Sequence, residues 1–123
     1  MTPNLNLKTN FLGCGPNLES TLKHNFEAAD LAAVGATGED AATTYRDSLQ
    51  TTYLGCGSHL AAALTADFEK VAMLIEDPEA EVVFSTQFYV GCSPHLSDDV
   101  VANFNILAAH FAAIASSIAA ILA

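Results

Sequence analysis

The apolar positions of the chain fall into three long helical patterns that repeat one another. Residues 11–26, 53–68 and 89–104 read FLGCGPNLESTLKHNF, YLGCGSHLAAALTADF and YVGCSPHLSDDVVANF. In each segment an aromatic residue and a Leu or Val precede Gly-Cys, and apolar residues then follow at steps of four, four, three and four, of which the last two lie beyond the Phe that ends the segment. This is the spacing of one face of an α-helix. The sequence therefore predicts three repeat units, near residues 11–38, 53–77 and 89–123, each with a helix of at least four turns.

Each Gly-Cys pair stands between the end of one element and the start of a repeat helix. Gly13, Gly55 and Gly91 follow the last apolar residue of the preceding element, where glycine can take the left-handed conformation that ends a helix. The Pro and Ser residues that come next are favoured at the cap and first turn of a helix. The sequence thus predicts a tight corner before each repeat helix.

Two shorter segments connect the repeat helices. Residues 39–54 have helical spacing, and residues 78–90 open with acids and a proline typical of a helix start but continue with strand-forming residues. We predict a helix for both, because they hold equivalent places. The first ten residues alternate in polarity and are expected to form an extended arm, either an edge strand or a segment that reaches a neighbour. The predicted fold is all-α: one domain over residues 1–123, an up-and-down bundle of about five helices.

The direction of the chain then brings the three corners together. If each element runs antiparallel to the one before it, all three corners lie at the same end of the bundle. A set of thiols and imidazoles would gather there: Cys14, Cys56, His59, Cys92 and His95. Two thiolates and two imidazoles can hold Zn²⁺ in a tetrahedral site, and the third Cys can replace or add a ligand. Zinc is the one cofactor that the sequence suggests.

Other roles stay open for these residues. Asn17 takes the place of the His in the first repeat, so that corner offers at best half a site. The favoured interpretation is that each Cys is a small apolar plug and each His or Asn a polar cap of its corner. A redox-active thiol, activated by the helix N-terminus, is a third alternative.

The C-terminal helix has no charged side chain between residues 100 and 123. Its apolar seam steps by four and three, and nine of these 24 residues are alanine. The segment is long enough to cross a bilayer, but its Asn, His and Ser residues make insertion unfavourable, so we expect no membrane span. We expect His110 to bond a backbone carbonyl. One small bundle cannot surround such a helix, so we predict a contact between subunits at Phe111, Ile114, Ile118 and Ile121.

Charge and composition exclude several function classes. Fourteen acidic residues against four Lys and Arg give a net charge of −10, which disfavours binding to nucleic acids and to anionic membranes. Three cysteines are too few, and odd in number, for a disulfide framework. Residues 1–8 lack the pattern of a signal peptide, so the cytoplasm is the default location. No common nucleotide-binding, nucleophile or metalloprotease motif is present, which favours a function other than catalysis.

Two functions are compatible with these patterns. The preferred one is a structural or interaction subunit that forms homo-oligomers through its Ala-rich C-terminal helix. The alternative is a metal- or cofactor-binding helical bundle that uses the Cys and His residues of the three corners. The sequence does not identify a small-molecule ligand.

Overall fold

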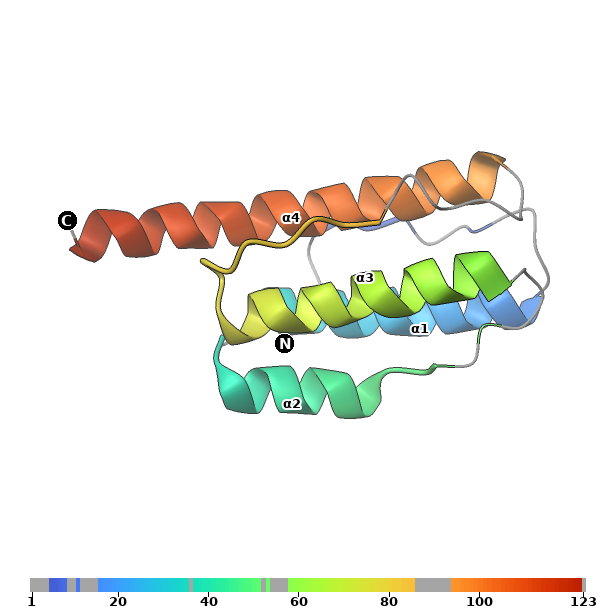
Figure 1. Cartoon of the computed structure of the whole chain (residues 1–123), viewed down its shortest axis with the longest axis horizontal. Coiled ribbons are helices and arrows are strands. Elements are labelled where there is room, and N and C mark those ends of the chain that lie inside the picture. The colour runs from blue at the N-terminus through green and yellow to red at the C-terminus, as the bar shows by residue number, and fades with distance from the viewer. Residues whose placement is uncertain are drawn as a thin grey trace.

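The computed structural model describes residues 5–8, 11, 16–35, 37–51, 53, 58–85 and 94–122. These residues form four helices, α1 (Pro16–Ala33), α2 (Glu39–Ser48), α3 (Ser58–Glu76) and α4 (Pro94–Leu122). Helices α1, α3 and α4 pack side by side and run in the same direction, while the shorter α2 runs back along α1 and α3 (Figure 1). The all-α class predicted from the sequence is confirmed.

The three helices that follow a Gly-Cys pair in the sequence begin at the same end of the molecule (Figure 1). Helix α2 carries the chain back to that end after α1, and the segment that follows α3 runs back along the bundle toward it. The count of antiparallel passes therefore gave the correct directions of α1, α3 and α4.

The predicted fifth helix is wrong over the part of it that the structure describes. Residues 80–85 are not helical, and residues 86–90 lie outside the described part of the chain. Branched and aromatic side chains favour extended backbone in this segment. Side chains of α3 then replace the hydrogen bonds that a helix would make: Lys70 Nζ donates to the Val83 carbonyl (2.5 Å), and the Ser85 N–H donates to Asp67 Oδ1 (2.6 Å).

The core is centred on three phenylalanines, one from each of the parallel helices. Phe26, Phe68 and Phe104 occupy the last position of the sequence template and are at most 2% exposed. Their ring centroids are 4.9, 5.0 and 5.0 Å apart, with interplanar angles of 58, 60 and 62°. These are favourable tilted and edge-to-face contacts. The three rings therefore make nearly identical contacts with one another where α1, α3 and α4 meet.

Helix α4 belongs to this core over only part of its length. Its apolar seam is buried from Leu96 through Val100, Phe104 and Leu107 to Phe111. From Ala112 onward no described side chain of the helix is buried, and the helix projects beyond the ends of its neighbours (Figure 1). We call residues 112–121 the α4 tip.

Candidate functional site

The predicted metal ligands fall largely outside the described residues. Cys14, Cys56 and Cys92 are not among them, and for His59 and His95 the structure describes the backbone, in the first turns of α3 and α4, but not the side chain. Within the described part of the chain no group of three or more His, Cys, Asp or Glu side chains could hold a metal ion. The zinc site therefore stays a prediction.

His110 was predicted to bond a backbone carbonyl, and this is confirmed. Its Nε2 donates to the carbonyl of Ala33 at 2.7 Å. Ala33 is the last residue of α1, where carbonyls lack an intrahelical partner. His110 therefore ties the end of α1 to α4 just before the α4 tip begins.

The predicted oligomer contact divides into a buried and an accessible part. Phe111 is fully buried inside its own chain, so it offers no surface to a second copy. Ile114 and Ile118 are half-buried, and Ile121 is 82% exposed. The seam that α4 buries against α1 and α3 thus continues into the α4 tip, where Ile114 still packs against the core. The surface available to another molecule lies mainly beyond it, at Ile118 and Ile121.

Helix α4 is also the one described helix that is long and apolar enough to cross a membrane, over Leu96–Ile121. Length and composition alone do not distinguish such a span from a core helix. Here Phe104, Leu107 and Phe111 are fully buried in the bundle. A span over these residues would remove them from the contacts that they make in the core, and Phe104 would leave the rings of Phe26 and Phe68. Of the apolar 18-residue window in this helix, 17% is buried inside the bundle.

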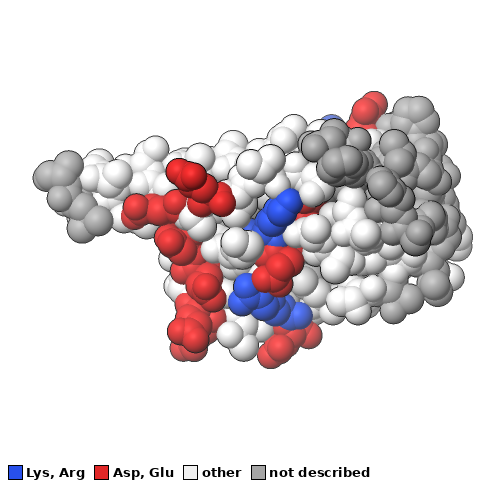
Figure 2. Space-filling model, viewed as in Figure 1, with Lys and Arg blue, Asp and Glu red and all other residues white. Residues whose placement is uncertain are grey.

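Acidic side chains gather at the end of the bundle from which the α4 tip projects (Figure 2). Helix α2 begins there with Glu39 and Asp40, beside Glu76 and Asp77 at the end of α3. The two ends are joined by the Gly38 N–H, which donates to the Ile75 carbonyl (2.8 Å). Copies of this end repel each other unless salt screens the charges. The uncharged α4 tip extends beyond this acidic end.

Two buried asparagines hold extended segments of the chain against the bundle. Asn25 on α1 donates to the Gln50 carbonyl (2.8 Å) and accepts from the Gln50 N–H (2.9 Å). Asn103 on α4 makes the same pair of bonds to Lys8, at 2.9 and 2.5 Å. Both asparagines are fully buried. Each amide therefore satisfies both polar groups of one backbone residue, as a neighbouring strand would.

Helix α3 makes the equivalent contact with two residues. Asp67 stands at the template position of Asn25 and Asn103 and is also fully buried. Its carboxylate accepts from the Ser85 N–H but cannot donate. Lys70, one turn further along, supplies the missing donor to the Val83 carbonyl and lies 3.6 Å from the Asp67 carboxylate. Asp67 and Lys70 thus bond two different backbone residues, Ser85 and Val83, where each Asn bonds both groups of one residue.

These contacts connect the three parallel helices in a cycle. Helix α1 holds the segment that precedes α3, α3 holds the segment that precedes α4, and α4 holds the arm that precedes α1. The apolar spacing does not reveal these three polar residues, because they lie at positions that the pattern leaves variable. The available signal was their shared place directly before Phe26, Phe68 and Phe104.

Helix α2 is fixed to α3 by polar contacts. The buried Tyr45 hydroxyl donates to the Phe68 carbonyl (3.0 Å), and burial raises the pKa of Tyr45 well above its ordinary value. On the surface, Arg46 pairs with Glu69 at 2.6 Å. Such an exposed pair contributes about 0–1 kcal/mol.

Tyr53, in the segment between α2 and α3, is also buried. Burial raises the pKa of Tyr53 to about 12, although a hydrogen bond from Asn25 lowers it.

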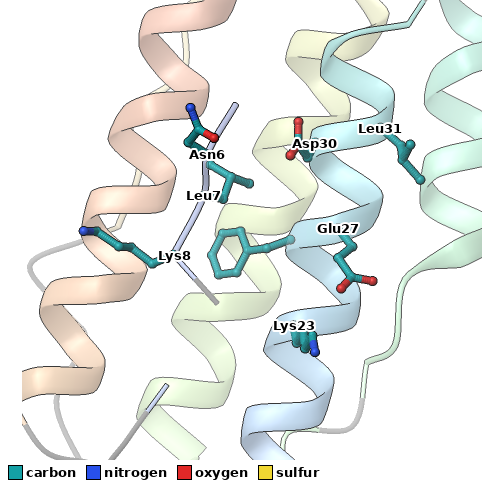
Figure 3. A pocket seen from close by; sticks show the side chains of 8 residues that line it. Asn6, Leu7, Lys8, Lys23, Glu27, Asp30 and Leu31 are labelled. Carbon is teal, nitrogen blue, oxygen red and sulfur yellow. The ribbon is translucent and has the colours of Figure 1, made fainter. Parts of the chain in front are cut away.

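Two grooves run along α1. One, of about 280 Å³, lies between α1 and the arm, which itself lies between α1 and α4 (Figure 3). Leu7 points from the arm toward α1, but the walls also carry four charged residues, Lys8, Lys23, Glu27 and Asp30. The other, of about 380 Å³, lies between α1 and α2 and has no charged side chain in its lining. We call it the α1–α2 groove; its lining residues are Ala28, Leu31, Ala32, Gly35, Ala41, Thr44, Tyr45 and Ser48.

Comparisons with protein-family models, with curated proteins and with solved structures found no match to this chain. Its function is therefore argued from its own residues.

Proposed function

We propose that this protein is a self-associating helical subunit that forms homo-oligomers through the α4 tip. The observation that carries the proposal is the seam beyond Ile114: Ile118 and Ile121 continue the line of buried residues past the last seam side chain that packs against the core. Full burial of an Ile side chain is worth about 1.5–3 kcal/mol. The alanines between them let another helix approach closely. A second copy of the chain carries the same apolar tip and is present at the same concentration as the first, so we propose it as the partner.

Replacing Ile118 by Glu is expected to weaken self-association at least about 100-fold, because the contact would then lose an apolar side chain and bury a charge. The measurement is sedimentation velocity in reducing buffer at about 0.15 M salt, where the charges of the acidic end are screened. Ser117→Glu is the matched control: it adds the same charge to a neighbouring exposed position off the seam. Equal association of Ile118→Glu and the parent chain would contradict the proposal.

We also infer that the three repeat units of the sequence are three equivalent structural units. They are arranged around an axis that passes between the rings of Phe26, Phe68 and Phe104. Support comes from the near-equal ring distances and from the cycle of contacts made by Asn25, Asp67 and Asn103. Each unit then consists of an extended segment, a corner and a helix. Helix α2 is an addition to the second unit.

A zinc site at the three corners is a second candidate, supported by the common end at which α1, α3 and α4 begin. Two Cys-x-x-His pairs, Cys56 with His59 and Cys92 with His95, would supply a complete tetrahedral set. Protein purified with Zn²⁺ is then expected to hold one zinc per chain by elemental analysis, and Cys56→Ser/Cys92→Ser to hold none. Full stability of the metal-free parent, with no zinc uptake, would exclude this function.

A further inference from the structure

The α1–α2 groove and the α4 tip share a property that is rare on this molecule. The chain has 18 charged side chains, yet neither the lining of the groove nor the tip contains one. A net charge of −10 makes most other pairs of surfaces repel when two copies meet. The groove and the tip can therefore approach each other without bringing charged walls together or burying a charge.

Both surfaces are also rich in small side chains. Among the residues that line the groove, Tyr45 is buried and Leu31 has 42% of its surface exposed, while α1 contributes the small residues Ala28 and Ala32 and Gly35 follows its end. The tip presents single Ile side chains separated by alanines and serines. Small residues on both sides allow helix axes to come close, so that Ile side chains enter the groove.

The two surfaces lie on opposite sides of the molecule. Helix α4 and helix α2 flank α1 and α3 from opposite directions (Figure 1). A contact between unlike surfaces of identical copies is heterologous, and it produces a ring or an open chain of subunits. The tip and the groove of one copy would therefore engage two different neighbours.

We propose that the α4 tip of one copy docks in the α1–α2 groove of the next, and that subunits assemble head to tail. This inference rests on the proposed self-association through the tip and names the surface that receives it. The parent chain is then expected to grow beyond a dimer as its concentration rises, because every added subunit offers a new free groove or a new free tip.

The test uses one variant on each surface. Thr44→Arg places a charge in the wall of the groove, and Ile118→Glu places one on the tip; each variant alone is expected to be monomeric at about 50 µM. Mixed together, they retain one intact tip and one intact groove, so they are expected to form a 1:1 dimer that cannot grow. Thr43→Arg is the matched control, since Thr43 is an exposed neighbour outside the groove whose hydroxyl makes the same type of bond to a helix carbonyl.

Sedimentation velocity of the two variants and their mixture separates the outcomes. A dimer that appears only in the mixture, with Thr43→Arg like the parent, supports the groove as the receiving surface. If Thr44→Arg assembles as the parent does and the mixture gives no dimer, the groove is wrong while assembly through the tip stands. If the parent stops at a dimer, head-to-tail growth is wrong. If the parent is a monomer, both proposals fail.

Discussion

Replacing Phe104 by Ala is expected to lower the free energy of unfolding by about 3–5 kcal/mol, the range for removing a large aromatic side chain from a packed core. Phe104 touches both other rings of the central cluster, Phe26 and Phe68, at 5.0 Å. Its removal therefore leaves a cavity at the point where all three parallel helices meet. Urea denaturation followed by circular dichroism measures the change.

Two further variants make this prediction specific. Phe84→Ala also removes a ring that lies 5.1 Å from Phe104, but Phe84 is only half-buried, so a smaller loss of about 1–2 kcal/mol is expected. Phe104→Leu keeps most of the volume and provides a folded variant if Phe104→Ala is too unstable to measure. A loss below about 1 kcal/mol for Phe104→Ala would contradict the central position of this ring.

Asn103→Asp is expected to cost about 1–3 kcal/mol, because a carboxylate cannot donate to the Lys8 carbonyl and the burial of a charge is unfavourable. Helix α3 shows how the chain solves this problem, with Lys70 one turn after Asp67. Adding Ile106→Lys to Asn103→Asp reproduces that arrangement on α4 and is expected to restore at least about 1 kcal/mol. Urea denaturation of the single and double variants measures both changes.

The matched control for this pair is Asn105→Asp, which introduces the same change at an exposed position of α4 and is expected to alter stability by less than about 0.5 kcal/mol. Ile106→Lys alone serves as the second control. If the double variant is no more stable than Asn103→Asp, the contacts of α3 and α4 are not equivalent, and the inferred three-unit arrangement loses its support.

The helices and their directions could be predicted because the signals are local and repeated. Apolar residues at steps of three and four mark α1, α3 and α4, and the same template three times makes a chance match improbable. Direction followed from the number of passes between corners. This count does not depend on whether a returning segment is helical, and so the wrong helix over residues 80–85 did not change it.

The error at residues 80–85 has a tertiary cause. The strand-forming composition was visible in the sequence, but the analogy with residues 39–54 outweighed it. The bonds that decide the conformation come from Asp67 and Lys70, which are 18 and 13 residues away from their partners Ser85 and Val83. Buried polar residues of this kind cannot be found from hydrophobic spacing, because they occupy positions that the pattern treats as variable.

Of the two surfaces proposed to meet in the assembly, only the α4 tip could be predicted from the sequence. The α4 tip is a continuous segment, so its missing charges and its seam can be read from the sequence, although the burial of Phe111 cannot. The α1–α2 groove is formed by residues from two helices, and its shape depends on how α2 lies against α1 and α3. No sequence pattern defines that arrangement.

Sedimentation equilibrium of the parent chain in reducing buffer tests self-association most directly. We expect a weight-average mass that rises steadily above the 12.9 kDa of one chain as the protein concentration increases. A mass that stays at 12.9 kDa up to about 100 µM would contradict this expectation.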